Sequence, residues 1–83
     1  MKENNIVTLN GENGKSLDFR IEAELEYDGY LYQILRPLKK YNDLNDEAIV
    51  FRVEYTSNYG YEYFVEEDDE IISQIEKIYN SEL

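Results

Sequence analysis

Cysteine and histidine are both absent from the 83-residue chain. A chain without cysteine forms no disulfide and offers neither a thiol nucleophile nor a thiolate metal ligand. A chain without histidine lacks the commonest general base at neutral pH and the imidazole ligand of zinc fingers. The composition therefore predicts that the protein is not an enzyme, needs no cofactor and has no catalytic or metal-binding residue.

Long apolar runs are absent as well. No stretch approaches the roughly 20 apolar residues that span a bilayer, and residues 1–5 lack the apolar segment of a signal peptide. Proline occurs once and glycine four times, and no linker-like segment interrupts the chain. We expect a single soluble, cytoplasmic domain over residues 1–83 that does not contact a membrane.

Positive charge is scarce: eight Lys and Arg residues face nineteen Asp and Glu residues, for a net charge of −11. Such a chain repels the phosphates of nucleic acids and of anionic lipids. We therefore expect no nucleic-acid partner. The acidic residues either keep a small domain soluble or attract a basic protein, in the extreme case by imitating nucleic acid.

Apolar and polar residues alternate most clearly over residues 16–27. A period of two predicts a strand with one buried face and one solvent-exposed face. The alternating apolar residues are Leu17, Phe19, Ile21, Ala23, Leu25 and Tyr27. Shorter runs predict further strands near 5–9, 30–38, 48–56 and 61–65.

Two turn signals set the expected strand pairing. Asp28-Gly29 predicts a two-residue type I′ hairpin, which places Tyr27 opposite Tyr30, Leu25 opposite Tyr32, Ala23 opposite Ile34 and Phe19 opposite Leu38. The same register places Arg36 opposite Ile21 on the apolar face, so we expect a bulge or a sheet edge near Pro37. Gly60 suits the left-handed position of a second hairpin, in which Tyr55 would face Tyr63 and Val53 would face Val65.

The periodicity changes to that of a helix near residue 68. The apolar stripe consists of Ile71, Ile72, Ile75, Ile78 and Tyr79. The acidic run 66–70 suits a helix N-terminus, with Asp68 or Asp69 as the N-cap. We interpret this run as capping chemistry, because consecutive acids do not converge on a metal ion.

These patterns predict an α+β domain. About five antiparallel strands form a strongly twisted, meander-like sheet, and one amphipathic C-terminal helix near 68–81 packs on its apolar face. We expect Phe19, Ile21, Phe51 and Val53 to be buried beneath this helix. One helix is narrower than five strands, so either the sheet coils around the helix or part of the tyrosine-rich face remains for a partner.

Five apolar residues are candidates for a partner surface, because tyrosine and phenylalanine outside the core often mark interfaces. They are Leu31, Leu35, Tyr59, Tyr61 and Phe64.

Several segments together resemble the YrzB-like family of small acidic bacterial proteins of unknown function. They are residues 4–9, 25–29, 47–54 and 62–65, with Tyr32, Pro37 and Leu38. The chain departs from the family pattern at residues 39–41 and in the hairpin at 58–60. The resemblance implies a stand-alone cytoplasmic domain and assigns no catalytic residue.

The sequence leaves two functional hypotheses. The first is a non-catalytic protein-binding or regulatory module with an unknown protein partner, itself a monomer or weak homodimer. The alternative is a nucleic-acid mimic that inhibits a basic DNA- or RNA-binding protein.

Overall fold

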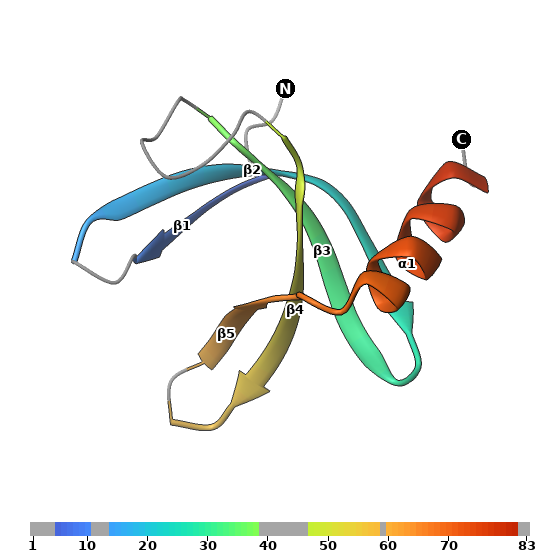
Figure 1. The fold of residues 1–83 in the computed structure, drawn as a ribbon. Coiled ribbons are helices and arrows are strands. Elements are labelled where there is room, and N and C mark those ends of the chain that lie inside the picture. Colours follow the sequence, from blue (N-terminus) through green and yellow to red (C-terminus); the bar gives the residue numbers. More distant parts are fainter. Residues whose placement is uncertain (1–4, 11–13, 39–46, 59, 82–83) are drawn as a thin grey trace.

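The computed structural model describes residues 5–10, 14–38, 47–58 and 60–81 of the chain. Five strands and one helix follow one another (Figure 1). The elements are β1 (Ile6–Asn10), β2 (Ser16–Tyr27), β3 (Tyr30–Pro37), β4 (Ile49–Thr56), β5 (Gly60–Val65) and α1 (Asp69–Ser81).

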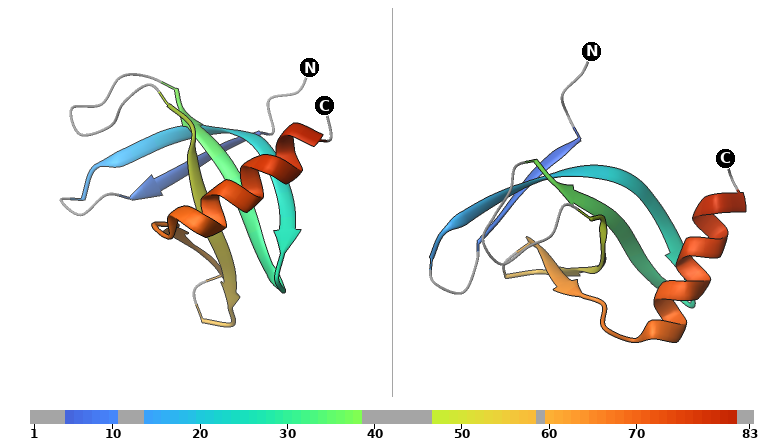
Figure 2. Two further views of the ribbon diagram at one scale, coloured as in Figure 1. Left: turned by 45° about the vertical axis from the view of Figure 1, so that its right-hand side comes forward. Right: turned by 45° about the horizontal axis from the view of Figure 1, so that its top comes forward.

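The five strands form one antiparallel sheet in the order β1-β2-β3-β4-β5, so each strand pairs with its neighbours in sequence. The sheet is strongly curved, and α1 crosses one of its faces (Figure 2). This arrangement confirms the predicted α+β fold with a meander sheet and a C-terminal helix. Strands β1 and β5 form the two edges of the sheet.

The first hairpin begins as predicted. Asp28 and Gly29 both have positive φ, at 55° and 85°, as a type I′ turn requires. Tyr27 pairs with Tyr30 and Ala23 pairs with Ile34. The turn chemistry therefore fixes the register of the first five residue pairs.

Beyond Ala23 the predicted register is wrong, because a bulge interrupts β2 between Ile21 and Ala23. Ile21 pairs with Leu35 instead of Arg36, and Phe19 pairs with Pro37 instead of Leu38. The extra residue is Glu22, and its Oε2 accepts a 2.7 Å hydrogen bond from Nε of Arg36. The irregularity expected near Pro37 thus lies on the neighbouring strand.

The second hairpin is also shifted from the prediction. Gly60 has a φ of 79°, as expected, and pairs with Thr56. Tyr55 therefore faces Tyr61 instead of Tyr63, and Val53 faces Tyr63 instead of Val65. A shift of two residues preserves the side-chain alternation, so each residue keeps the face that the pattern assigned to it.

The bulge gives the sheet two apolar faces. On the helix-side face, Tyr32, Ile34 and Val50 pack with Ile75 of α1, which is fully buried. The partly buried residues around them are Ala23, Leu25, Tyr27, Ile71, Ile72 and Tyr79. This cluster contains the second half of β2.

The opposite face carries a separate cluster of Phe19, Leu35 and Phe51. This is the groove-side face, because a groove opens on it. The partly buried residues around them are Val7, Leu9, Leu17, Ile21, Ile49 and Tyr63. The expectation that Phe19, Ile21, Phe51 and Val53 lie beneath the helix is therefore wrong. Phe19, Ile21 and Phe51 belong to this second cluster. Val53 lies two residues after Phe51 on β4, so its side chain points to the same face as that of Phe51.

Asp68 is the N-cap of α1, one of the two predicted candidates. Its Oδ1 accepts hydrogen bonds from the backbone N–H of Glu70 at 2.9 Å and of Ile71 at 3.4 Å. Just before it, Glu66 is tied to the sheet, because its N–H donates to the Val50 carbonyl at 2.9 Å and its carboxylate lies 3.7 Å from Arg52. These contacts fix the position from which the helix starts.

Replacing Leu35 with alanine tests whether the groove-side face contains a true core. Leu35 is fully buried without facing the helix, so we expect Leu35→Ala to lower the free energy of unfolding by about 2–5 kcal/mol. Chemical denaturation measures this loss. Methyl NMR shifts should change around Phe19 and Phe51 and stay constant at Ile75; large changes at Ile75 would show that the two clusters are one.

Candidate functional site

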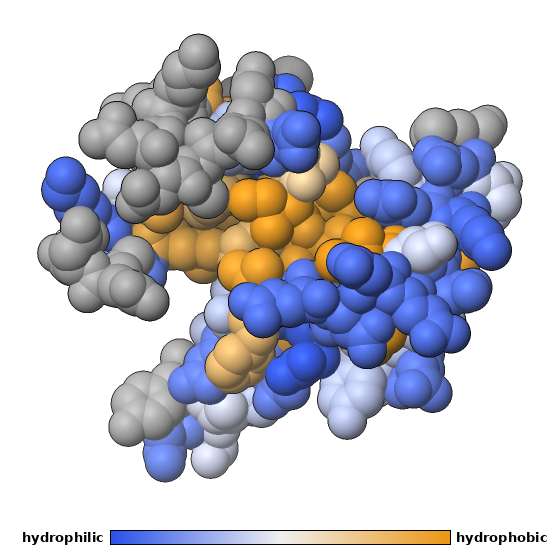
Figure 3. Space-filling model, in the orientation of Figure 1, coloured by the Kyte–Doolittle hydropathy of each residue, from blue (hydrophilic) through white to orange (hydrophobic). Residues whose placement is uncertain are grey.

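An open groove lies on the groove-side face, between edge strands β1 and β5. Its volume is about 700 Å³, within the usual range of about 300–1,000 Å³ for ligand pockets. Apolar surface is visible in the hollow between the two arms of the sheet (Figure 3). The lining residues are Thr8, Leu9, Asn10, Leu17, Phe19, Ile49, Phe51, Tyr61, Glu62, Tyr63, Phe64 and Val65.

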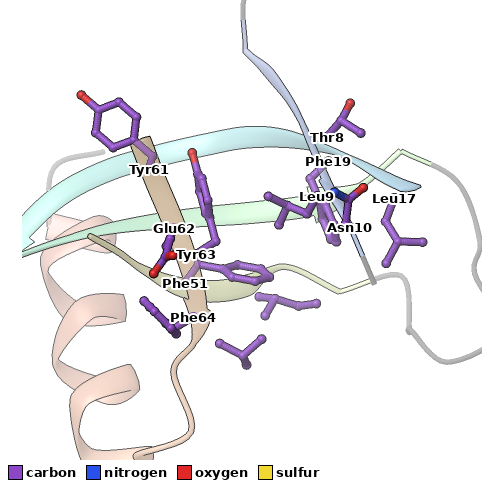
Figure 4. A pocket seen from close by; sticks show the side chains of 12 residues that line it. Thr8, Leu9, Asn10, Leu17, Phe19, Phe51, Tyr61, Glu62, Tyr63 and Phe64 are labelled. Atoms are coloured by element: carbon purple, nitrogen blue, oxygen red, sulfur yellow. The ribbon is translucent and has the colours of Figure 1, made fainter. Parts of the chain in front are cut away.

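The floor of the groove is built from three aromatic rings. Phe51 of β4 contacts Phe19 of β2 edge-to-face, with ring centroids 5.8 Å apart, and Tyr63 of β5 in the same way at 6.1 Å. Figure 4 shows Phe51 between Tyr63 on one side and Phe19 on the other. Edge-to-face packing is a favoured arrangement of aromatic rings. The three rings therefore form one packed floor.

The rim of the groove on the β5 side exposes large apolar residues. Tyr61 is 66% exposed and Val65 is 53% exposed, although both side chains belong to the apolar face of the strand. The Tyr61 ring packs against Tyr55 of β4, with centroids 5.3 Å apart. Among the described residues, no further strand pairs with β5 on this side. The rim thus presents apolar side chains beside an open strand edge.

A polar contact joins Tyr63 of the floor to buried Gln33 of β3, on the same face. Gln33 is buried, and its Oε1 has no hydrogen-bond partner within the described part of the chain. Burial raises the pKa of Tyr63, nearby Glu24 adds to the rise, and a hydrogen bond with the Gln33 side chain opposes it. The Tyr63 phenol therefore holds its proton more tightly than an exposed tyrosine does.

The opposite face of β5 is organised around Arg52. Its guanidinium lies over the rings of Phe64 (5.3 Å) and Tyr30 (5.6 Å), and its Nε donates to Glu54 at 2.9 Å. The hydrogen bond to Glu54 is the main reason that the pKa of Arg52 is raised. Glu62 stands directly opposite Glu54 and forms no ion pair with any residue of the described segments.

The structure brings only part of the predicted partner surface to the groove. Tyr61 and Phe64 border it, and both are exposed. Leu35 is a correction: it is fully buried in the groove-side cluster and offers no surface. Leu31 pairs with Val53 on the groove-side face and is half-buried, whereas Phe64 pairs with Arg52 on the other face. Tyr59 lies outside the described residues.

Sequence reasoning missed the residues that form most of the groove. Phe19 was assigned to a core beneath the helix because the alternation of residues 16–27 has no visible break, and Leu9 and Leu17 were not singled out. A signal for two apolar faces was present in β4, where Ile49, Val50 and Phe51 follow one another. Consecutive apolar residues indicate a strand that is buried on both faces.

No three metal-ligating side chains converge within residues 5–10, 14–38, 47–58 and 60–81. In the same segments, α1 is too short and too polar to cross a bilayer. What remains as a candidate site is the groove. It is an apolar concavity in a small acidic α+β domain.

Comparison with known proteins places the chain in a family. Residues 12–83 match the family described as protein of unknown function (DUF1292), and the chain belongs to that family. It is 44% identical to a UPF0473 protein of Heliobacterium modesticaldum over 83% of this chain and 75% of that one. It is 32% identical to a UPF0473 protein of Alkaliphilus oremlandii over 96% of this chain and 91% of that one.

These matches confirm a bacterial family of unknown function, as the resemblance implied, but they do not carry the YrzB-like name. No solved structure is significantly similar to the chain.

The raised pKa values predict how stability changes in alkali. Burial is also the main reason that the pKa of Tyr32 is raised, so the unfolded chain releases the protons of Tyr32 and Tyr63 before the folded chain does. This contribution to stability is fully present below about pH 10 and is lost as the pH rises through the folded pKa values. We expect denaturation midpoints to fall above pH 10, and less steeply in Tyr63→Phe. An unchanged slope in both Tyr63→Phe and Tyr32→Phe would contradict the assignment.

Proposed function

We propose that the protein is a small, non-catalytic, cytoplasmic protein-binding module whose binding site is the groove between β1 and β5. The observation that carries this proposal is the open concavity itself, with an aromatic floor and the exposed side chains of Tyr61 and Val65 at its rim. Aromatic and aliphatic residues at the centre of a patch, with polar residues around it, are typical of protein interfaces.

An empty groove leaves apolar side chains in contact with water, which costs free energy. Each Å² of apolar surface removed from water contributes about 25 cal/mol, and large contiguous apolar patches are uncommon on monomers unless they bind something. Alanine or serine at position 65 would avoid this exposure without disturbing the floor. A partner that covers the rim explains why Val65 and Tyr61 remain apolar.

The alternative of a nucleic-acid mimic has less support. Mimicry needs a row of free carboxylates along one surface. On β2, the Asp18 side chain accepts a 2.6 Å hydrogen bond from Thr8, and Glu22 is paired with Arg36. The bulge also places Glu24 on the face opposite to Asp18. The acidic row is therefore broken and divided between two faces.

Comparing two matched double variants tests the proposed function. Tyr61→Ser with Val65→Ser removes the apolar rim. Tyr30→Ser with Leu38→Ser is the control, because these residues are 49% and 39% exposed and neither lines the groove. Each immobilised protein is used to capture proteins from an extract of the source bacterium, and captured proteins are identified by mass spectrometry.

We expect the wild type and the control to retain a common partner and the rim variant to lose it by about tenfold or more. NMR titration with that partner should shift the signals of Leu9 and Val65 before those of α1. The proposal is wrong if the rim variant captures the same proteins as the wild type, or if the titration perturbs only the helix-side face. Circular dichroism verifies that each variant is folded.

A further inference from the structure

The direction of the edge strands limits what can close the groove. Because the sheet is an antiparallel meander of five strands, β1 and β5 run in the same direction. They could pair with each other only in the parallel mode. One additional strand between them, however, can be antiparallel to both. The sheet would then become a closed six-stranded up-and-down barrel without edges.

The backbone of β1 is oriented to receive such a strand. The N–H of Ile21 donates to the Asn5 carbonyl at 2.6 Å, which makes Asn5 and Ile21 a hydrogen-bonded pair. In an antiparallel ladder, such pairs alternate with pairs whose N–H and C=O groups point away from the partner strand. The N–H and C=O groups of Ile6, Thr8 and Asn10 therefore point away from β2.

The backbone of β5 is oriented in the matching way. The N–H of Glu66 donates to Val50, so by the same alternation Phe64 and Glu62 bond to β4. The N–H and C=O groups of Tyr61, Tyr63 and Val65 point away from β4. Both β1 and β5 thus present a row of N–H and C=O groups along their outer edges. No strand in the described part of the sheet pairs with these groups.

The side-chain alternation of the two edges is compatible with one regular strand. Residues that bond to β5 would stand opposite Tyr61, Tyr63 and Val65, so their side chains would point into the groove. Residues that bond to β1 would stand opposite Ile6, Thr8 and Asn10, so their side chains would point to the other face. A regular strand alternates in this way. Its inward residues must be apolar, because the floor is aromatic.

Charge indicates the nature of the outward residues. Glu62 faces the like charge of Glu54 across the ladder, and in the described structure no cation pairs with it. A basic residue on an adjoining strand would relieve this repulsion. The net charge of −11 attracts a cationic segment and opposes a second copy of this chain, which carries the same charge.

We propose, on the basis of the protein-binding function above, that the groove binds one extended segment of a partner protein that alternates apolar and basic residues. This segment lies antiparallel to both β1 and β5 and completes the barrel. Strands β1 and β5 contain five and six residues, so the segment spans about 17–20 Å. Backbone hydrogen bonds supply affinity, and the alternating side chains supply specificity.

The experiment uses the full chain and four synthetic peptides of about seven residues. The first alternates lysine and valine. The second has the same composition in an order without alternation, the third replaces lysine with glutamate, and the fourth carries N-methyl groups on alternate backbone nitrogens. Isothermal titration calorimetry measures each affinity. We expect the first peptide to bind at least about tenfold more tightly than the other three.

Variants of the chain test the same contacts from the other side. Val65→Pro removes an N–H that points away from β4, whereas Val65→Thr keeps that N–H and a β-branched side chain. We expect Val65→Pro to bind the first peptide about fivefold more weakly than Val65→Thr does. Glu62→Gln should weaken binding and make it less dependent on salt. Circular dichroism verifies the fold of each variant.

The outcomes separate this proposal from the proposed function. Equal binding of the methylated and unmethylated peptides, or of the acidic and basic ones, overturns the strand proposal. Absence of peptide binding overturns it as well, while loss of the captured partner in the rim variant would still support the groove as the binding site. Dimerisation in analytical ultracentrifugation that Val65→Pro abolishes would identify a second copy as the occupant and also overturn it.

Discussion

The bulge in β2 is the constraint on which the rest of the structure depends. Ile34 and Leu35 are consecutive residues of β3, and their partners Ala23 and Ile21 are two residues apart on β2 because Glu22 is extra. Because of this insertion, the apolar residues of β2 before Glu22 lie on the groove-side face, and those after Glu22 lie on the helix-side face. A long strand with one uninterrupted alternation thereby contributes to two cores, one on each face of the same sheet.

The groove is a consequence of this division. One helix of 13 residues covers the cluster around Ile75, and no second helix is present in the described residues to cover the cluster around Phe51. The sheet curls toward that second face until β1 and β5 line a common groove. Curvature buries Phe19 and Leu35 completely or nearly so, while the rim at Tyr61 and Val65 remains open. The sheet therefore coils, but around the groove and not around the helix as one of the two expectations had it, and it leaves Tyr61 and Val65 exposed.

Local signals predicted the elements well, because they depend on neighbouring residues. The Asp28-Gly29 turn, the left-handed Gly60 and the Asp68 cap each follow from short-range backbone chemistry. The assignment of faces failed because a bulge leaves no mark in the alternation of its own strand. Arg36 opposite Ile21 was the one visible conflict, and the structure resolves it on β2 instead of at Pro37. Leu35 was therefore taken for a surface residue, and the groove, which depends on long-range curvature, was not predicted.

Deleting one residue from β2 tests the central claim most directly. If Glu22 is the extra residue, its deletion leaves Ile21 and Ala23 on their present faces in a regular ladder. The chain should then fold cooperatively and lose only about 1 kcal/mol with the Glu22–Arg36 ion pair. Deleting Glu24 instead would place the Glu22 carboxylate opposite Ile34 beneath the helix, at a cost of about 3 kcal/mol or more. Denaturation of the two deletion variants measures this difference. Unfolding of the Glu22 deletion, or equal stability of the two variants, would contradict the account.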